Sequence, residues 1–354
     1  MLLHLRLIDW GLRSYKTKPL VWHAKEGCKH EWVLQKSALM HKNRNNLRGS
    51  QENCRDKTKT VWIKKFDAKL DSGFCSKCGA WKGSLGLEPT FNLYIQHLVQ
   101  LFDEAKRILA ADGTLWVNLG DTYVSKGATR HLGYADPKNP KAGKRDYIEP
   151  SALPQNLPEK CLAGIPFRFA IEMMKHGWIL RNTIIWQKPN CTVSSVKDRF
   201  TVDFEYVFFF VKQRKYSFEQ QFEERSDKRP HDIQRALHGH KKYAGKMNLP
   251  KEGSFAFQES KVAGNPLKGR NRRCVWKIVT KPFKGAHTAV FPSALVEPMI
   301  KAGCPKGGIV YDTFSGAGTT ALVAKKLGRH YLGSELNPEY VKMAEERIRK
   351  ETNK

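Results

Sequence analysis

The sequence has no long apolar run. No stretch of its 354 residues approaches the roughly 20 apolar residues that a membrane-spanning helix needs. Residues 2–8 are partly apolar, but this run is short and contains His4 and Arg6, which argues against a secretory signal peptide. We therefore expect a cytoplasmic protein with no membrane partner.

Acidic side chains are also scarce. The chain has 34 Asp and Glu against 62 Lys and Arg, which leaves a net charge of +28 at pH 7. This excess favours a polyanionic partner, most often nucleic acid, over a merely soluble basic protein. The length allows one large or two modest domains with a substantial core, and no internal repeat divides it.

The eight cysteines lack the compact, even spacing of a disulfide framework. Two of them form Cys75-x-x-Cys78, and Cys28-x-His30 lies upstream, so these four side chains suit tetrahedral Zn²⁺. A set of unrelated reduced thiols is the alternative, and Cys54 is a spare ligand. The other cysteines have no ligand spacing and are interpreted as ordinary thiols: Cys161, Cys191, Cys274 and Cys304.

Hydrophobic periodicity separates regular from irregular parts of the chain. Helices are predicted at 93–109 and 164–176, and buried strands at 114–121, 178–190 and 205–212. From residue 291 onward helices and strands alternate, which indicates a parallel α/β sheet. Two basic segments with Gly and Pro are predicted to be long loops, at 124–160 and 213–275.

A glycine-rich turn lies in this last, alternating part. Asp312 ends a strand, and "TFSGAGTT" then leads into a helix. Gly316 and Gly318 allow a tight turn and a close approach to a ligand, and the helix start offers N–H groups to an anion. About twenty residues on, the next strand ends at Glu335, where a carboxylate can accept hydrogen bonds from ribose hydroxyls. The dinucleotide pattern GxGxxG is absent, and a tight turn without a ligand is the alternative.

These segments resemble a known family. "YDTFSGAGTTALVAKKLGRHYLGSELNPEYVKMAEERI" is similar to the S-adenosylmethionine motif of the β-class DNA amino-methyltransferases, including Asn337-Pro338 after Glu335. "HTAVFPSALVEPMIKAGCPKGG" resembles the segment before it, where Phe291-Pro292 opens a helix beside the methionine end of the cofactor. Further segments between 85 and 212 match the middle of the family, so the resemblance covers about residues 10–348.

The resemblance implies an α/β, Rossmann-like S-adenosylmethionine-dependent methyltransferase sheet with a zinc-knuckle insertion and a basic target-recognition region. It implies methyl transfer to an exocyclic amine of a flipped base in double-stranded DNA, in a prokaryote or a phage. An inactive remnant that binds DNA and cofactor, or an RNA methyltransferase, is the alternative. The cofactor-binding residues that it implies are Asp312, Phe314, Ser315, Gly316, Gly318, Thr319, Thr320, Glu335, Asn337, Phe291 and Pro292.

Two further sets of residues are candidates for a site: four metal ligands and two polar residues at a strand end. Some family members carry a similar "CxHxW … FCxxCG" insertion, which supports a structural zinc ion on Cys28, His30, Cys75 and Cys78. At the end of the 114–121 strand, Asn118 and Asp121 are weaker candidates for catalysis.

The same comparison divides the chain into five regions. They are a truncated remnant of the catalytic strand and loop (1–24), a zinc-binding insertion (25–82), a catalytic half (83–212), a target-recognition region (213–280) and a cofactor-binding region (281–354). Residues 213–275 mix positive charge with aromatic and amide side chains, which suits contacts to phosphates and bases; a solvated loop is the alternative. Neither the target sequence nor a partner restriction nuclease can be read from the residues.

The start of the chain departs from the family. Members usually read Ser-Pro-Pro-Tyr-Trp-Gly-Leu-Arg-x-Tyr. A Ser (or Asp) side chain at the first position and the first Pro carbonyl accept the hydrogens of the amine, and the Tyr stacks on the flipped base. Here Trp10 to Tyr15 match, but residues 5–9 replace the catalytic part, and we expect the strand before it to be missing.

Back-translation offers a hypothesis for this departure. In a shifted frame, the codons of residues 1–8 permit Val-Ile-Thr-Ser-Pro-Pro-Tyr directly before Trp10. The hypothesis is a frameshifted reading frame restarted at an internal start codon, and the alternative is a divergent N-terminus. The shifted frame permits Ser but not Asp at the first catalytic position, which favours cytosine N4 over adenine N6 as the target.

Overall fold

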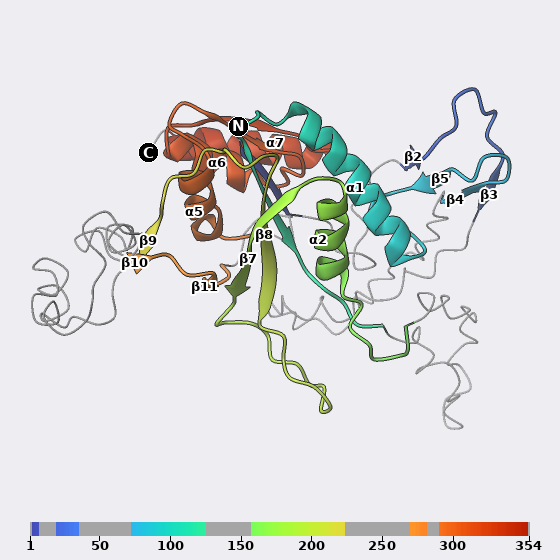
Figure 1. Ribbon diagram of the computed structural model, residues 1–354, viewed down its shortest axis with the longest axis horizontal. Coiled ribbons are helices and arrows are strands. Elements are labelled where there is room, and N and C mark those ends of the chain that lie inside the picture. The colour runs from blue at the N-terminus through green and yellow to red at the C-terminus, as the bar shows by residue number, and fades with distance from the viewer. Residues whose placement is uncertain are drawn as a thin grey trace, which may run out of the picture.

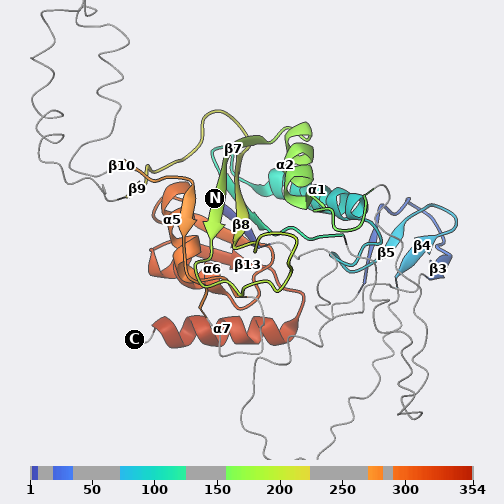
Figure 2. The ribbon, with the colours of Figure 1, turned by 90° about the horizontal axis from the view of Figure 1, so that it is seen from below.

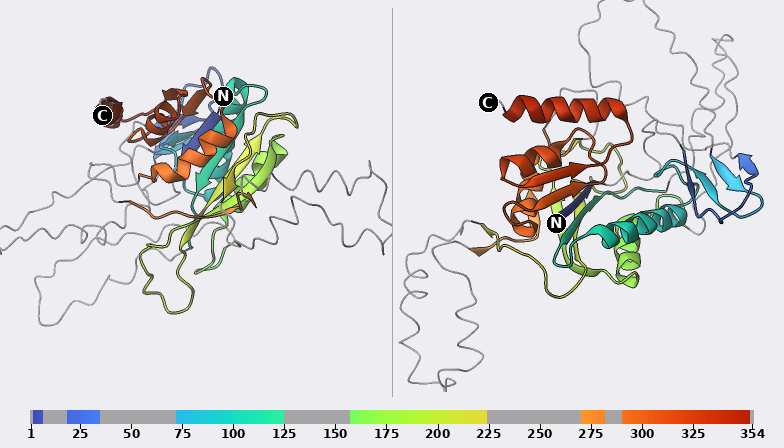
Figure 3. Two further views of the ribbon diagram at one scale, coloured as in Figure 1. Left: turned by 90° about the vertical axis from the view of Figure 1, so that its left-hand side faces the viewer. Right: turned by 90° about the horizontal axis from the view of Figure 1, so that it is seen from above.

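The computed structural model describes residues 2–6, 19–34, 72–124, 157–223, 270–281 and 290–352. This part of the chain forms a seven-stranded sheet with helices on both faces, and a separate four-stranded sheet (Figures 1 and 3). No helix in the described ranges has the length and apolar character required to cross a membrane. The α/β class predicted from the sequence is confirmed.

The strands of the large sheet have the order β11–β7–β8–β6–β1–β12–β13. They are β1 (Leu2–Arg6), β6 (Thr114–Leu119), β7 (Ile179–Gln187), β8 (Phe204–Val211), β11 (Val275–Lys277), β12 (Ile309–Asp312) and β13 (His330–Gly333). The strands are parallel except β8, which runs antiparallel to its neighbours β6 and β7. All strands but β8 therefore end at one edge of the sheet, here called the carboxyl edge.

Helices cover both faces of this sheet. On one face lie α1 (Phe91–Ile108) and α2 (Ile165–Lys175), and on the other α5 (Ser293–Gly303) and α6 (Thr319–Lys326), while α7 (Pro338–Thr352) packs against α6. Successive side chains of β6 point to opposite faces of the sheet and are buried on both. Leu115 and Val117 belong to the α1–α2 core, and Trp116 belongs to the α5–α6 core. The helices predicted at 93–109 and 164–176 are confirmed.

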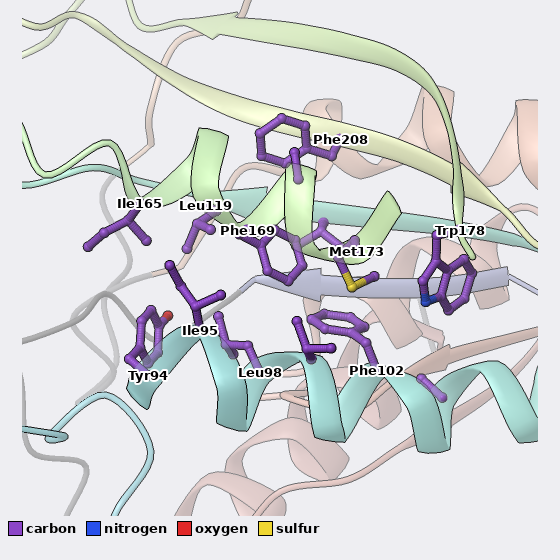
Figure 4. Packing of buried hydrophobic residues seen from close by; sticks show 14 of the residues in the cluster. Tyr94, Ile95, Leu98, Phe102, Leu119, Ile165, Phe169, Met173, Trp178 and Phe208 are labelled. Atoms are coloured by element: carbon purple, nitrogen blue, oxygen red, sulfur yellow. The ribbon is translucent and has the colours of Figure 1, made fainter. Parts of the chain in front are cut away.

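Aromatic rings fill the core between α1, α2 and the sheet. Figure 4 shows Phe102 of α1 facing Phe169 of α2, with Phe208 of β8 above them. The rings of Phe102 and Phe169 lie 5.2 Å apart at 54°, a tilted arrangement that aromatic pairs favour. This packing holds β6 and β8, and with them the carboxyl edge, in fixed positions.

The strand expected to be missing before Trp10 is present, so that prediction is wrong. Leu2–Arg6 is an interior strand of the sheet, where it pairs with β12 up to His4↔Asp312 and with β6 up to Arg6↔Asn118. Strand pairing uses backbone N–H and C=O groups, which every residue here supplies, so polar residues within the segment did not prevent it. Several predicted features lie outside the described residues: the Trp10–Tyr15 segment, Cys54, and most of the two basic loops.

The connections between successive parallel strands run toward opposite edges of the sheet on the two sides of β1. From β12 the chain continues through α6 to β13 on one side, whereas from β1 it reaches β6 on the other side through α1. In open α/β sheets, ligands bind outside the carboxyl ends of the strands at such a reversal of the connections. The ends of β6, β1 and β12 therefore mark the expected position of a site.

The smaller sheet is antiparallel, with the order β2–β5–β4–β3. Its strands are β2 (Leu20–Trp22), β3 (Trp32–Leu34), β4 (Gly73–Cys75) and β5 (Trp81–Gly83). Trp22 and Trp81 are buried and stack on His97 of α1, with ring centroids 4.4 and 5.2 Å from the imidazole. His97 Nδ1 lies 2.9 Å from Glu88 Oε1, and both side chains are fully buried. The small sheet is thereby attached to the large one through α1.

Two short strands, β9 (Phe222–Glu223) and β10 (Arg270–Asn271), form an antiparallel pair. Glu223 accepts hydrogen bonds from the guanidinium groups of Arg270 and Arg273, at 2.8 and 2.6 Å. This pair brings together the two ends of the basic segment 224–269.

Candidate cofactor site and metal centre

Asp312 ends β12 and organises the turn that follows. Its carboxylate is buried and accepts hydrogen bonds from the Phe314 N–H at 3.0 Å and from the Thr320 hydroxyl at 2.6 Å. These bonds connect the end of the strand to the first turn of α6. The predicted strand–turn–helix is therefore present, with the intervening residues held in a compact turn.

The glycines of this turn are required by its backbone. Gly316 has a φ of 50°, and Gly318, the N-cap of α6, has a φ of 72°. A Cβ at position 318 would lie 2.8 Å from Cβ of Ala344 in α7. Glycine at 318 thus permits both the left-handed conformation and the close approach of α7.

We expect Gly318→Ala to lower the free energy of unfolding by more than Gly328→Ala does. Both glycines flank α6 with φ near 72° and 71°, and this conformation costs an alanine about 1–2 kcal/mol. Only position 318 adds the contact with Ala344, because nothing lies within 4 Å of a Cβ at 328. Denaturant unfolding measures both variants, and Ala344→Gly should recover part of the Gly318→Ala loss. Equal losses would contradict the packing argument.

Glu335 lies two residues beyond β13 and faces the glycine turn. Its Oε2 accepts the Gly316 N–H at 2.8 Å, and its Oε1 accepts the Asn337 N–H at 2.9 Å. The Asn337 side chain in turn accepts the N–H of Glu339 at the start of α7. Because a carboxylate has about four lone-pair positions, each oxygen of Glu335 can accept a further hydrogen bond.

The remaining predicted cofactor residues do not share one face of the sheet, because Phe314 packs against the α1–α2 core. The Ser315 N–H donates to the Ser334 carbonyl at 3.0 Å, which joins the turn to the end of β13. Phe291 is buried in the α5–α6 core, and Pro292 is the N-cap of α5. Thr319 is buried and accepts a hydrogen bond from Arg347 of α7 at 2.8 Å. Sequence reasoning missed Arg347, because an arginine on a helix without a motif carries no signal.

Two buried oxygens at the carboxyl edge have no hydrogen-bond partner among the described residues: Asn118 Oδ1 and Thr313 Oγ1. The Asn118 amide nitrogen donates to the Tyr206 carbonyl at 3.0 Å, which fixes the direction of its oxygen. Asn118 pairs with the end of β1, and Thr313 follows Asp312 on the other side of β1. Buried polar atoms without partners are rare and call for a ligand, an ion or water. Thr313 was not predicted, although its place after the acidic strand end was a signal.

Asp121 has a structural role at the start of α2. Its carboxylate accepts the N–H groups of Thr122, Gly164 and Ile165 at 2.9 to 3.1 Å, and thereby caps a helix whose own N-cap is a glycine. Burial raises the pKa of Asp121, and these hydrogen bonds oppose the shift. Of the two weaker candidates, only Asn118 keeps an unpartnered polar atom within the described residues.

The four predicted metal ligands converge in the small sheet. Cys28 Sγ lies 4.0 Å from Cys75 Sγ, and Cys78 Sγ lies 3.4 Å from His30 Nδ1. All four ligand atoms lie within 4.8 Å of one another. Ligands bound at zinc distances in a tetrahedron are separated by about 3.5–3.8 Å, so this cluster fits a tetrahedral metal ion.

The electrostatics of the cluster also favour a cation. Burial, together with the neighbouring thiols of Cys78 and Cys75, raises the pKa of Cys28 to about 11. Burial acts to raise the pKa of Cys75 as well, but hydrogen bonds from His30 and from backbone N–H groups outweigh it and lower that pKa to about 6. A bound divalent cation allows all three thiols to ionise together.

The metal cluster and the glycine turn lie in different parts of the molecule. In Figures 1 and 2 the small sheet lies beyond the end of α1, away from α6 and α7. A metal ion held by this cluster would therefore not touch the glycine turn.

A family model described as DNA methylase matches residues 56–346, which include β4 and β5 of the small sheet, the glycine turn and part of α7. The chain belongs to this N6/N4 DNA methylase family. The methylase is 38% identical over 267 residues to the type II methyltransferase M.Cfr9I of Citrobacter freundii, covering 75% of each chain. It is also 38% identical over 267 residues to the type II methyltransferase M.SmaI of Serratia marcescens, covering 75% of this chain and 77% of that relative.

Solved structures also match the methylase. The cytosine-N4-specific PvuII DNA methyltransferase aligns with a TM-score of 0.45 and 17% identity, covering 74% of this chain and 77% of that one. Membership of the family confirms the activity that the sequence implied: S-adenosylmethionine-dependent methylation of amino groups in DNA.

Proposed function

We propose that the methylase binds S-adenosylmethionine at the glycine turn after β12 and receives the target base beside it, at the end of β1. The observation that carries the proposal is that Asn118 Oδ1 and Thr313 Oγ1, on either side of β1, have no hydrogen-bond partner in the part of the chain that the structure describes. They lie at the carboxyl edge, where the connections of the sheet reverse. S-adenosylmethionine, when bound, supplies the methyl group.

Each part of the turn has a chemical role in this proposal. The free lone pairs of Glu335 accept hydrogen bonds from the ribose hydroxyls. The start of α6 has no side-chain cap, so its first N–H groups suit the carboxylate of the methionine moiety. Asp312 and Arg347 shape the turn, and Phe291 and Pro292 hold the start of α5 beside α6. The same proposal includes Phe314, Ser315, Gly316, Gly318, Thr319, Thr320 and Asn337.

The target amine needs hydrogen-bond acceptors, because both of its hydrogens point into the site once the base has flipped out of the duplex. Asn118 Oδ1 is a buried acceptor at the end of β6, adjacent to β1. It therefore suits one hydrogen of an exocyclic amine and positions the nitrogen.

The finer assignments extend the proposal. M.Cfr9I and M.SmaI are named type II methyltransferases, and we assign the chain to the same type, acting on double-stranded DNA. The codon argument for Ser supports cytosine N4 as the target. Zinc is assigned to the four-ligand cluster, and the division into a zinc insertion, a catalytic half, a recognition region and a cofactor region is retained.

Expression in a bacterial host without this modification tests the function. Nucleosides from host DNA, separated by mass spectrometry, are expected to contain N4-methylcytosine, and sequencing should place it at one short sequence. Asp312→Ala, which removes the organiser of the turn, should abolish the signal. N6-methyladenine would overturn the choice of base, and methylated RNA would favour an RNA methyltransferase.

A second chain, with residues 1–8 encoded in the shifted frame, tests the remnant alternative. Methylation by that chain alone would support the frameshift hypothesis. Unmodified DNA with both chains would favour a remnant that binds DNA and cofactor.

A further inference from the structure

The loop between β7 and β8, residues 188–203, exposes apolar side chains to solvent. Phe200 is 95% exposed and Val193 is 80% exposed, while Val196 and Val202 are exposed to 40% and 50%. A phenylalanine in water forgoes the free energy of burial, and exposed apolar side chains gathered beside a site mark a binding surface.

This loop leaves the sheet at the carboxyl edge. Because β7 and β6 both run antiparallel to β8, β7 ends at the same edge as β6, β1 and β12. Figure 1 shows the yellow-green loop extending past the arrowhead of β7, and Figure 2 views the molecule from that side. The exposed ring thus projects from the edge that carries the glycine turn.

The backbone on both sides of Phe200 is braced. The Lys188 N–H donates to the Asp203 carbonyl at 2.7 Å across the base of the loop, and the Ser194 N–H donates to Thr201 Oγ1 at 3.2 Å in its outer part. Asp198 pairs with Lys160 at 2.6 Å, and the Arg199 guanidinium lies 3.5 Å from the ring centroid of Tyr123. These contacts hold the backbone that carries the Phe200 ring in place.

The surroundings of the ring fit a polyanion with apolar surface between its charges. Lys197 and Arg199 are exposed next to Phe200, and the nearby Asp198 is neutralised by Lys160. The whole chain carries a charge of +28. Duplex DNA offers both features, because cations contact its phosphates and apolar side chains insert between its base pairs.

We propose that Phe200 is a wedge that inserts into the base stack of duplex DNA beside the target base. An enzyme that acts on a base must take it out of the stack, and the gap that remains costs stacking free energy. An aromatic ring in the gap restores part of this stacking and holds the base outside. This inference rests on the proposed function, since it requires that DNA approaches the carboxyl edge.

A binding experiment tests the wedge without a recognition sequence and without methyl transfer. Fluorescence anisotropy compares a matched duplex with the same duplex containing one abasic site, in which a gap already exists. The unaltered chain is expected to bind the abasic duplex more tightly. Phe200→Ala should weaken that binding by roughly 5- to 150-fold and remove the preference, whereas Phe200→Trp should keep it.

Ile309→Ala is the control, because it removes an exposed apolar side chain at the start of β12, at the edge of the sheet opposite the carboxyl edge. Its affinity for both duplexes should equal that of the unaltered chain. Equal affinities of the unaltered chain and Phe200→Ala would overturn the wedge and leave the proposed function intact. Failure of the unaltered chain to bind either duplex would overturn both. A changed oligomeric state of Phe200→Ala with unchanged DNA affinity would assign the loop to contacts between protein copies, and would also overturn the wedge.

Discussion

Cys75→Ser should release the metal and loosen the small sheet, while the large sheet stays folded. The four strands β2 to β5 are three residues long each, too short to be stable without a tether. Structural zinc supplies folding free energy directly, and loss of one thiolate opens the tetrahedral set. Metal analysis should fall from about one zinc per chain to none. The fluorescence of the buried Trp22 and Trp81 should shift to longer wavelength.

The matched control for this prediction is Cys274→Ser. Cys274 is exposed and lies outside the cluster, so its replacement removes a thiol and leaves the metal in place. A chelator should reproduce the Cys75→Ser spectrum in the unaltered chain. Unchanged zinc content in Cys75→Ser would show that the cluster is not the metal site.

Glu335→Gln should weaken S-adenosylmethionine binding by roughly 10- to 150-fold, the range for the loss of charge-assisted hydrogen bonds. The carboxylate accepts two backbone N–H groups and has lone pairs left for the ribose. An amide replaces one acceptor oxygen by an NH₂ group, which faces a backbone donor. Isothermal titration with S-adenosylmethionine measures the effect.

Glu345→Gln provides the control, because it makes the same change of charge at an exposed position of α7. Its affinity should be unchanged, and both variants should unfold at similar temperatures. If the two variants bind the cofactor equally well, Glu335 is not the ribose ligand.

Local features of the chain were predictable from its residues. The glycine turn combines apolar periodicity, two glycines and flanking carboxylates within about 25 residues, and such short-range signals determine a strand–turn–helix. The metal cluster was predictable although its two halves are far apart in the sequence, because Cys and His at ligand spacing have few other uses. The close approach of Ala344 to Gly318 was not predictable from the sequence, because it depends on how α7 packs against α6.

The features that the sequence did not predict depend on contacts between residues far apart in the chain. The apolar sequence of β8 predicts a buried strand but carries no signal for its antiparallel direction. Leu2–Arg6 is too short for a periodic signal, and it becomes a strand because β6 and β12 leave a place between them. The capping role of Asp121 likewise requires α2 to begin next to it, 43 residues along the chain from Asp121 to Gly164.

The place of β1 has a consequence for how the protein is made. His4 pairs with Asp312, so about 300 residues must be synthesised before β1 meets its second neighbour. At the usual rates of translation this interval lasts roughly 15–60 s. Closing so long a loop is entropically unfavourable, and folding dominated by such distant contacts is slow. The nascent chain therefore holds one side of β1 unpaired until β12 emerges, and assembly of the sheet's centre is among the last events of synthesis.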